Sequence, residues 1–285
     1  MDNIDFDDFD EEEKYDGYID FSNIDSEIKS YIIGFLYADG HISDYTISVR
    51  LSINDEEHLK ILSKIFNKEI FYRDIKNKNG KTYKSVGFNY CNKKTIDTLR
   101  KIGFVKRKTY QIDDVVFRNI PYQFKKDFIR GFYDGDGTIF FSKWTRNSNW
   151  KTSERCSVGF VSYNSVLLNS IKDFLQEELD LPIGKRIRSD RFKDDESKNN
   201  KYWRLIYNGN KISKKIMDYL YGDATIYMNR KYDKYLKIKV HKIKGYTYSK
   251  TRDRWIFKYM DGDILRKKSF KTEEDGINFL KEIKK

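Results

Sequence analysis

The chain of 285 residues is poor in the side chains that form disulfides and hold soft metals. It has only two cysteines, Cys91 and Cys156, which are far apart and in no metal-binding spacing. Two isolated cysteines fit a reduced compartment better than secretion. Its three histidines, His41, His58 and His241, form no cluster, which argues against a zinc site and against a histidine-metal nuclease.

Long apolar runs are missing as well. No segment resembles a signal peptide, and no apolar stretch is long enough to cross a bilayer. We therefore expect no membrane partner and an intracellular location, in the cytoplasm or in the nucleoid or nucleus.

Charge is distributed unevenly along the sequence. Residues 1–27 contain twelve acidic residues and one base, Lys14, and so carry a net charge of −11. Because the whole chain carries +12, the remainder carries +23. A folded body this basic points to a polyanionic partner, although a solvated lysine-rich surface would give the same charge.

The composition divides the chain into four segments. Residues 1–22 form an acidic tail that we predict to be disordered. Two halves of similar pattern follow, at 23–120 and 121–239, and a segment of different pattern occupies 240–285.

Two stretches of nine residues stand out, one in each half. They are IIGFLYADG at residues 32–40 and IRGFYDGDG at residues 129–137. Each reads as a helix end with two small residues four positions apart, followed by an acid and a glycine. Residues four apart share one helix face, and small side chains there let two helices approach closely. The final glycines, Gly40 and Gly137, suit the left-handed position just past a helix end.

If the two helices pack side by side, Asp39 and Asp136 emerge at the same end of the pair. A helix C-terminus already carries partial negative charge, so two carboxylates there are unfavourable without a cation. Oxygen ligands suit Mg²⁺, with Mn²⁺ as an alternative. The sequence therefore predicts a divalent metal site at Asp39 and Asp136, assisted by the backbone carbonyls of Ala38 and Gly135.

The two stretches resemble the motif of the LAGLIDADG homing endonucleases, in the single-chain form that carries two copies. Both nine-residue motifs match, with the family's acid falling on Asp39 and Asp136. One copy alone would be weak evidence, because a glycine-rich helix end is usually only a helix end. The copies differ where Tyr37 stands in the first and Asp134 in the second. We expect this position to cap or space the helix and not to bind metal.

The resemblance also implies further site residues. The family places a basic residue near each active site, where it helps to activate water or to stabilise charge. An internal repeat puts Lys108 and Lys231 at matching positions, so both are nominated as catalytic. A lysine that caps a helix or contacts a phosphate would fit these positions equally well.

The repeat covers most of the two halves. Residues 51–66 match 161–175, residues 83–102 match 202–221, and 107–109 match 230–232. Such duplication predicts an α+β fold of two pseudo-symmetric αββαββα halves with the motif helices on the shared axis. Asn54 and Asn164 occupy matching positions and look like N-caps, although they could also position water.

Hydrophobic periodicity places the elements. The predicted helices lie at 25–39, 55–67, 92–102, 122–136, 165–179 and 210–221, and the predicted strands at 41–53, 69–75, 81–90, 138–144, 155–163, 185–192 and 201–208.

In the resembled family the two sheets form a saddle over the major groove of DNA. The polar strand faces would then point at the duplex, where arginine and lysine read base edges or bind phosphate. The DNA-contacting candidates are Ser48, Arg50, Ser52, Lys81, Tyr83 and Ser85 in the first half, and Lys143, Arg146, Arg186, Arg188 and Arg204 in the second.

The segment 240–285 has the pattern of three short strands and one helix. Lys244-Gly245, Arg254-Trp255 and the run SFKTEE at 269–274 make it similar to the DNA-binding domain of plant ethylene-response factors. In that family the sheet lies in the major groove. The alternative is a small basic cap packed on the body. The contacts that the resemblance implies are Arg252, Arg254, Trp255, Lys258 and Arg266.

Taken together, the resemblances imply a monomeric, site-specific, metal-dependent endonuclease of a mobile genetic element that cuts double-stranded DNA. The alternative is a non-cutting nucleic-acid binder on the same fold, either a transcription regulator or an RNA maturase that helps an intron to fold. Binders of this family often lose a motif acid, and this chain has both, which favours the enzyme. Its ends, Met1 and Lys285, are not the residues of an intein, so no splicing is expected.

Overall fold

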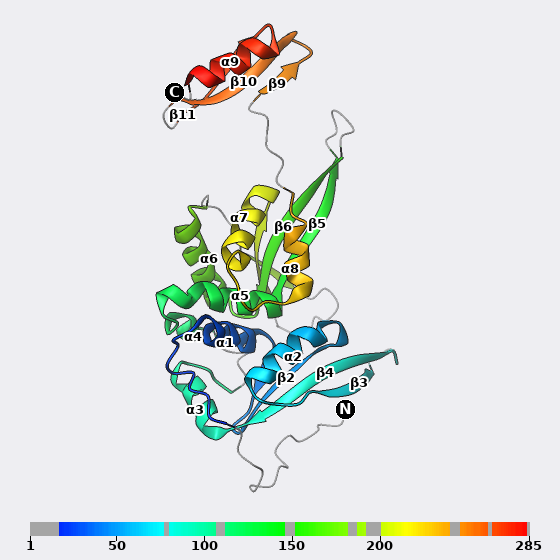
Figure 1. Cartoon of the computed structure of the whole chain (residues 1–285), viewed down its shortest axis with the longest axis vertical. Coiled ribbons are helices and arrows are strands. Elements are labelled where there is room, and N and C mark those ends of the chain that lie inside the picture. The colour runs from blue at the N-terminus through cyan, green and yellow to red at the C-terminus, as the bar shows by residue number, and fades with distance from the viewer. Residues whose placement is uncertain are drawn as a thin grey trace. The chain divides into compact units, whose positions relative to one another are not determined.

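Helices α1 (Glu27–Asp39) and α5 (Lys125–Asp136) lie side by side, with one four-stranded sheet on either side of the pair (Figure 1). A Cβ atom on Gly34 would overlap the carbonyl oxygen of Phe128, and one on Gly131 would overlap that of Tyr31. The two backbones therefore touch at these glycines. The close approach predicted from the small residues is confirmed, because no side chain fits between the helices.

The computed structural model describes residues 17–76, 80–106, 112–145, 152–181, 187–191, 201–239, 246–261 and 264–283. The chain divides into two compact units, Met1–Lys239 and Val240–Lys285. No helix within the described ranges is both long and apolar enough to cross a membrane.

The two halves of the larger unit have the same element order and sheet topology. In the first half the strands are ordered β1-β2-β4-β3, and in the second β5-β6-β8-β7, with every neighbouring pair antiparallel. The predicted α+β fold of two pseudo-symmetric αββαββα halves is confirmed. The elements of the first half after α1 are β1 (Gly40–Ile42), β2 (Thr46–Ser52), η1 (Ile53–Asp55), α2 (Glu56–Ile65), β3 (Phe71–Lys76), β4 (Thr82–Cys91) and α3 (Lys93–Lys101).

The second half repeats this order. Two short elements, α4 (Val115–Arg118) and η3 (Tyr122–Phe124), precede α5, and α8 closes the unit. The elements that follow α5 are β5 (Gly137–Thr145), β6 (Thr152–Ser162), α6 (Ser165–Leu179), β7 (Ile187–Arg191), β8 (Lys201–Asn208), α7 (Asn210–Tyr221) and α8 (Asn229–Leu236).

Each sheet is apolar on the face that its helices cover. In β2 the buried side chains are Ile47, Val49 and Leu51, which alternate with polar residues and pack under α2 and α3. This period of two buries one face of a strand and leaves the other open. Each half therefore presents one polar sheet face away from its helices.

The packed body begins earlier in the chain than the sequence suggested. Phe21 is fully buried, and its amide donates to Thr98 Oγ1 at 3.0 Å, while the amide of Ile19 donates to Thr95 Oγ1 at 2.9 Å. Residues from Gly17 onward thus lie on α3 and belong to the first half, not to the acidic tail that we placed at 1–22. A single apolar anchor in a charged stretch is too short a pattern to stand out in sequence.

Only one of the two predicted asparagine caps is present. Asn164 caps α6 by accepting from the amides of Val166 and Leu167, both at 3.1 Å. Asn54 instead lies inside the 3₁₀ turn η1, and α2 starts behind Asp55. Val49 and Phe160 are equivalent because each pairs with the glycine that follows a motif acid. Helix α2 begins seven positions after Val49, whereas α6 begins five positions after Phe160. The two additional residues form the turn and move Asn54 away from the cap.

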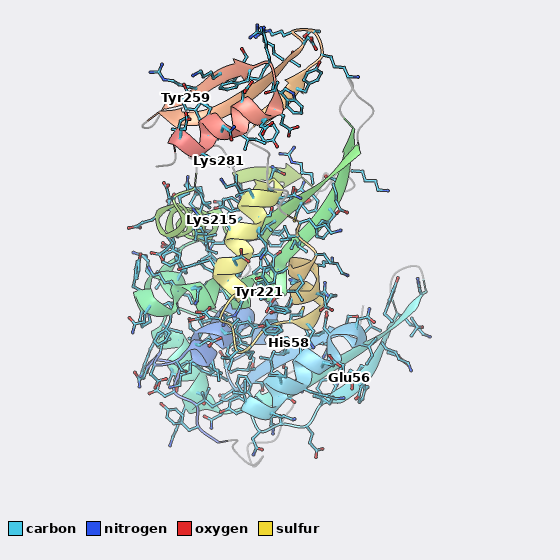
Figure 2. All side chains as sticks on the ribbon, turned by 45° about the horizontal axis from the view of Figure 1, so that its top comes forward. Glu56, His58, Lys215, Tyr221, Tyr259 and Lys281 are labelled. Atoms are coloured by element: carbon cyan, nitrogen blue, oxygen red, sulfur yellow. The ribbon has the colours of Figure 1, made fainter. Side chains whose placement is uncertain are left out.

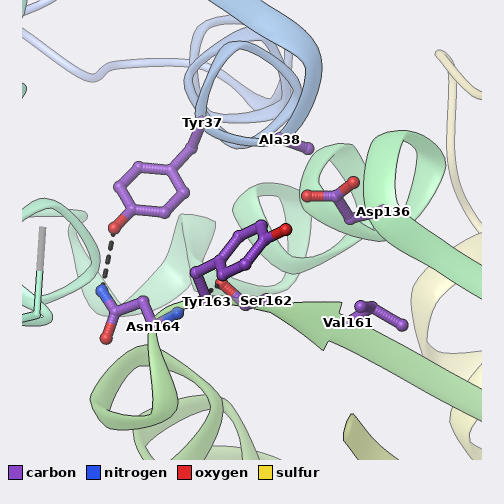
Figure 3. Close-up of a pocket in the computed structure, with 7 residues that line it drawn as sticks. All are labelled: Tyr37, Ala38, Asp136, Val161, Ser162, Tyr163 and Asn164. Carbon is purple, nitrogen blue, oxygen red and sulfur yellow. Dashed lines mark hydrogen bonds between the residues drawn. The ribbon is translucent and has the colours of Figure 1, made fainter. Parts of the chain in front are cut away.

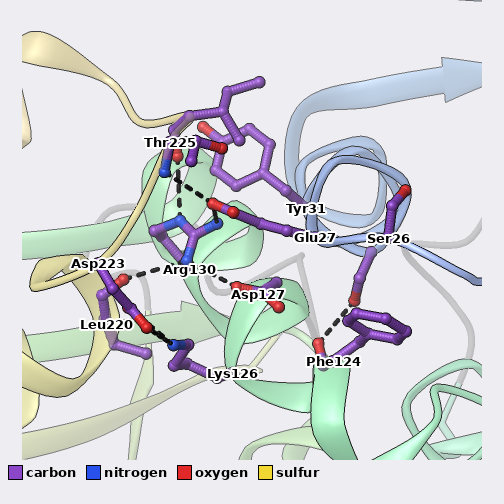
Figure 4. A network of polar contacts seen from close by, with 12 residues as sticks. Ser26, Glu27, Tyr31, Phe124, Lys126, Asp127, Arg130, Leu220, Asp223 and Thr225 are labelled. Carbon is purple, nitrogen blue, oxygen red and sulfur yellow. Dashed lines mark hydrogen bonds and ion pairs between the residues drawn. The ribbon is translucent and has the colours of Figure 1, made fainter.

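A buried arginine joins the halves from within α5. Arg130 has no solvent exposure, and Figure 4 shows it at the centre of a polar network. Its guanidinium donates to Asp127 at 2.8 Å and to Glu27 of α1 at 2.6 Å, and also to the carbonyls of Ile226 and Leu220. Because removing one partner of such a buried pair leaves a charge unpaired, this network fixes α1, α5 and the α7–α8 connection together.

The smaller unit is a three-stranded antiparallel sheet with one helix, as predicted. Its strands are ordered β11-β10-β9. One face packs on the helix, where a Cβ on Gly276 would overlap the ring of Phe257, so a glycine is needed at this point of the helix. The elements are β9 (Tyr246–Ser249), β10 (Arg254–Asp261), β11 (Ile264–Phe270) and α9 (Glu273–Ile283).

Candidate active site and nucleic-acid faces

Both motif acids are exposed at the adjoining ends of the paired helices. Asp39 ends α1 and Asp136 ends α5. A Cβ built on Gly135 would contact the Cβ of Ala38 and lie 3.3 Å from Oδ2 of Asp39, so the carboxylate of one helix lies against the last turn of the other. The structure thus brings the two acids to one place.

The glycines after the acids have a different purpose from the one we predicted. Gly40 has φ −76° and ψ 142°, and Gly137 has φ −82° and ψ 161°, so both are extended and not left-handed. A Cβ on Gly40 would lie 2.7 Å from the carbonyl oxygen of Leu36, and one on Gly137 would overlap that of Tyr133. Each glycine lets the chain pass from helix straight into strand against the helix's own last turn.

Lys231 caps the end of α5. Its ammonium donates to the carbonyl oxygens of Tyr133, Asp134 and Gly135 at 2.5, 2.6 and 3.0 Å. Burial lowers the pKa of Lys231 to about 8, against the opposing effect of Asp134, Asp39 and Asp136, which favour the charged form. Below that pH the side chain is a fixed cation at the acidic helix ends. Lys231 therefore caps a helix, which was one of the two roles that the sequence allowed for it.

The matching lysine of the first half, Lys108, lies outside the described residues. Of the two carbonyls proposed as metal ligands, that of Gly135 accepts from Lys231 and has one lone pair left. Within the described ranges, no group of three or more His, Cys, Asp or Glu side chains could hold a metal. A cation at Asp39 and Asp136 would therefore complete its shell with carbonyl, water or phosphate oxygens.

The position two residues before each acid has opposite surroundings in the two halves. Asp134 has no solvent exposure, and its carboxylate accepts from the Tyr31 hydroxyl at 2.7 Å, the Tyr221 hydroxyl at 2.5 Å and the Met228 amide at 2.9 Å. The buried carboxylate of Asp134 thus already accepts three hydrogen bonds from other parts of the fold, and that this position binds no metal stays a prediction. Its role is to join elements, and not to cap or space its own helix.

Tyr37 occupies the same position in the first half and lies among aromatic rings. Its ring centroid is 5.7 Å from that of Phe104 and 6.2 Å from those of Phe128 and Phe132, and burial raises the pKa of its hydroxyl to about 12. The hydroxyl accepts from the side-chain amide of Asn164 at 3.0 Å. One half thus has a buried carboxylate where the other has an aromatic cluster.

A cavity lies beside each acid. One of about 220 Å³ is lined by Asp136, Ala38 and Tyr37 together with residues 161–164 of the β6–α6 corner (Figure 3). The other, of about 260 Å³, is lined by Asp39 and by the open face of the first sheet. Both acids therefore border space into which a phosphate group could enter.

The polar face of the first sheet gathers the residues proposed for this half. In register, Ser48 lies opposite Asn89, Ser52 opposite Ser85, and Ser85 opposite Arg73. Burial and the neighbouring guanidinium of Arg73 lower the pKa of Arg50, so positive charge is concentrated there. All six proposed residues follow this face or its continuation past β4, where Lys81 lies over the ring of Tyr83. Sequence reasoning missed His41, Phe71, Arg73 and Asn89, which share the face.

In the second sheet, one of the residues proposed to contact DNA lies on the helix-covered face. Ile139 and Phe141 face the core, so Lys143, two residues on, has the helix-side parity and does not lie on the polar face. The strand begins at once after the motif, which fixes its alternation from Thr138. Arg204 has the open-face parity, and Arg188 lies opposite it in register. Arg146 and Arg186 lie outside the described residues. The missed open-face residues are Thr138, Ser142, Arg155, Ser157 and Asn208.

The small unit also divides the proposed residues between two faces. Its open face carries Arg254 and Lys258 beside a hollow of about 530 Å³, which Arg252 also lines. Trp255 and Arg266 have the opposite parity and lie on the helix side: Trp255 contacts the rings of Tyr246 and Tyr248, and Arg266 is opposite Tyr259, which packs on Phe279. The missed open-face residues are Thr247, Ser249, Thr251, Ile256, Lys267 and Ser269.

A local signal for some of the missed residues existed. In β9 the small polar residues Thr247 and Ser249 alternate with Tyr246 and Tyr248, and this alternation marks one face. No such signal marked Asp134 or Arg130, because apart from Asp127, which lies in the same helix as Arg130, their partners are about a hundred residues away in sequence.

Solved structures of DNA endonucleases are similar to this chain at low identity. The meganuclease I-SmaMI bound to DNA is 13% identical, covers 74% of this chain and 90% of its own, and gives a TM-score of 0.49. The homing endonuclease I-WcaI bound to its recognition sequence is 13% identical, covers 75% of this chain and 88% of its own, and gives a TM-score of 0.49. The LAGLIDADG meganuclease I-AabMI bound to uncleaved DNA is 12% identical, covers 72% of this chain and 86% of its own, and gives a TM-score of 0.46.

No protein-family model matches the sequence, and no curated protein matches it. Because TM-scores below 0.5 describe only a loose similarity of chain trace, the fold described above rests on the chain's own sheets and helices.

Proposed function

We propose that the protein is a site-specific, divalent-metal-dependent endonuclease that cuts both strands of a DNA duplex. One observation carries this proposal: two exposed carboxylates, Asp39 and Asp136, meet at the ends of two helices that lie on a pseudo-two-fold axis. A DNA duplex has the same local symmetry, so each acid would serve one strand. Because the single chain supplies both halves, it would act as a monomer.

The donor set fits a hard cation. Asp39 and Asp136 would hold Mg²⁺ or Mn²⁺, with the carbonyls of Ala38 and Gly135 as further oxygen ligands. Bound there, such an ion would lower the pKa of a water molecule and polarise the scissile phosphate. The two cavities beside the acids give the phosphates access.

The chain's own residues prepare this site electrostatically. Lys231 neutralises the carbonyl end of α5, where the partial negative charge of the helix would otherwise add to that of Asp136. With three acceptors already around its ammonium, Lys231 holds its proton and fixes the backbone of the last turn. We assign it a positioning role and not that of a base. From the sequence repeat we extend this proposal to Lys108, which lies outside the described residues.

The two open sheet faces would lie on the duplex. Their arginines and lysines contact phosphate or guanine edges, and their hydroxyl and amide groups offer further hydrogen bonds. The residues we assign to this surface are Ser48, Arg50, Ser52, Arg73, Lys81, Tyr83, Ser85 and Asn89 in the first half and Thr138, Arg155, Arg188 and Arg204 in the second.

The small unit would add a second DNA contact through its own open face. That face carries Arg252, Arg254, Lys258 and Lys267 with several hydroxyl groups and no acid among the residues that line its hollow. A surface of this charge fits the phosphate backbone.

The experiment is a cleavage selection on a randomised duplex library, run with the full chain in Mg²⁺ and in parallel in Ca²⁺. We expect enrichment of one family of sites in Mg²⁺ and none in Ca²⁺. A chain that retains a sequence in a binding selection but cuts nothing in Mg²⁺ or Mn²⁺ is a binder, either a transcription regulator or an RNA maturase.

A further inference from the structure

Asp134 is the most connected buried carboxylate of the described residues, and the metal site does not use it. It lies two residues before Asp136, yet its side chain points into the protein and not to the exposed end of α5. Its donors come from three different elements: Tyr31 from α1, Tyr221 from α7 and the amide of Met228, which precedes α8. Figure 2 labels Tyr221 together with His58, whose ring nitrogen lies 3.1 Å from the hydroxyl of Tyr31.

The same residue holds α8 twice. Its carboxylate accepts from Met228, the N-cap residue of α8, at 2.9 Å. Its main-chain carbonyl accepts from Lys231, in the first turn of α8, at 2.6 Å. These two bonds fix both the start of α8 and the direction of its lysine. Since Lys231 also bonds the carbonyl of Gly135, the position of the last turn of α5 depends on this arrangement.

Among the described residues, the position in α1 that is equivalent to Asp134 holds no carboxylate. Tyr37 stands at the position of Asp134, and Phe128 stands in α5 where α1 has Tyr31. The hydroxyl of Tyr37 accepts from the side-chain amide of Asn164, in the opposite half. The end of α1 at Asp39 is therefore built without a buried carboxylate.

We propose that Asp134 is a positioning residue for the half-site at Asp136 alone, acting through α8 and Lys231. The inference rests on the endonuclease function proposed above. Each half-site serves one DNA strand, so loss of Asp134 slows the cutting of one strand and spares the other. A protein altered in this way converts supercoiled DNA to nicked circles before it linearises them.

The test uses the full chain with Asp134→Asn, and with Tyr221→Phe as a milder variant that removes one donor and keeps the acid. Tyr219→Phe is the matched control, because it removes from the same helix a hydroxyl that donates to Glu178 and not to Asp134. A selected duplex with a different label on each strand is cut in Mg²⁺, and Asp136→Asn shows which strand depends on the second half-site. For Asp134→Asn we expect that strand to be cut at least about tenfold more slowly than the other. Tyr221→Phe should change the ratio in the same direction by less, and Tyr219→Phe should leave it unchanged.

Hydrogen exchange of the amides in α8 gives a second measurement that needs no cleavage. Exchange should accelerate in Asp134→Asn and Tyr221→Phe but not in Tyr219→Phe. Equal slowing of both strands, or unchanged exchange in α8, overturns the proposal. If the parent cuts no target, the endonuclease assignment fails, while the exchange measurement still decides whether Asp134 holds α8.

Discussion

Tyr37 in α1 and Asp134 in α5 occupy equivalent positions, two residues before the motif acids, but the side chains packed around them differ in chemistry. Around Tyr37 the packing is aromatic, with Phe104, Phe128 and Phe132 within ring contact. Around Asp134 it is polar, with two tyrosine hydroxyls and a backbone amide on one carboxylate. The same backbone arrangement therefore tolerates either solution.

The comparison extends one turn back along each helix. Arg130 of α5 is buried with ion pairs to Asp127 and Glu27, whereas the equivalent position in α1 is the buried Ile33. The two halves share only a few features: the glycine at which α1 and α5 touch, the exposed acid at the helix end and the glycine after that acid. The shared features are those that the paired helix ends require, and the features that differ belong to the surrounding core.

The largest effect is expected where the halves are identical. Gly34→Ala and Gly131→Ala each place a Cβ on a carbonyl oxygen of the partner helix. Backbone cannot yield as a side chain can, so we expect a loss well beyond the roughly 1–3 kcal/mol typical of overpacking, large enough to abolish cooperative folding in one or both variants. Thermal unfolding by circular dichroism measures this. Gly17→Ala, where nothing lies within 4 Å of the new atom, is the matched control. Parental melting of both seam variants would mean that the helices do not touch there.

A smaller but unequal effect is expected at Arg130 and Ile33. Arg130→Leu leaves Asp127 and Glu27 without their buried partner, which typically costs about 3–5 kcal/mol. Ile33→Val removes one methyl group from the core at a cost of about 0.5–1.5 kcal/mol. Urea unfolding of the two variants compares them. Equal losses would show that the polar network contributes no more than ordinary packing.

The polar cluster around Asp134, which includes His58 of α2, should also make stability depend on pH. Burial lowers the pKa of His58 below its ordinary value of 6.5. The unfolded chain then binds a proton that the folded protein resists, so stability falls as pH drops below about 6.5, until the folded pKa is reached. His58→Gln keeps a hydrogen-bond donor for Tyr31 and cannot titrate. We expect its unfolding midpoint to vary less between pH 7 and pH 5 than that of the parent. Parallel curves would remove His58 as the cause.

The smallest effect concerns the two faces of the C-terminal sheet. Lys258→Ala and Lys267→Ala, on the open face, should each weaken DNA binding and reduce the slope of log affinity against log salt by about 1. Arg266→Ala, on the helix side, should leave the slope unchanged. Fluorescence anisotropy over a salt series with a labelled duplex measures both. An equal loss for Arg266→Ala would return it to the contact surface.

The sequence predicted what depends on local spacing. Helices α6 and α7 begin and end at the predicted residues, because their apolar period is clear and Asn164 caps the first of them. Alternation in β2 identified the polar face of the first sheet. The small pairs Gly34/Ala38 and Gly131/Gly135 predicted the helix contact, because small residues four apart on one helix face leave room for a second backbone.

The failures have local causes too. A two-residue difference between the halves moved Asn54 off its cap, and the immediate start of β5 after Gly137 put Lys143 on the helix side. Trp255 and Arg266 were contacts implied by the resemblance to the ethylene-response-factor domain, and their places in the strand alternation were not considered. Asp134 and Arg130 were beyond reach because, apart from the local pair of Arg130 with Asp127, their partners come from α1, α7 and the chain before α8, which only the folded protein brings together.

The central claim is that Asp39 and Asp136 form the cutting site, and a supercoiled plasmid carrying the selected target tests it. Asp39→Asn and Asp136→Asn keep the shape of the side chain and remove a metal-binding charge. Each should bind the target at least as well as the parent, since a negative charge facing phosphate is gone. Asp97→Asn, at an exposed acid of α3, is the control and should behave as the parent.

In Mg²⁺ we predict that each of the two motif variants linearises the plasmid about a hundredfold more slowly or worse, which corresponds to about 2.7 kcal/mol of transition-state stabilisation. Gel-shift titration of the same preparations shows that binding is intact. If both variants bind and still linearise the plasmid at the parental rate, Asp39 and Asp136 are only helix ends and the endonuclease account is contradicted.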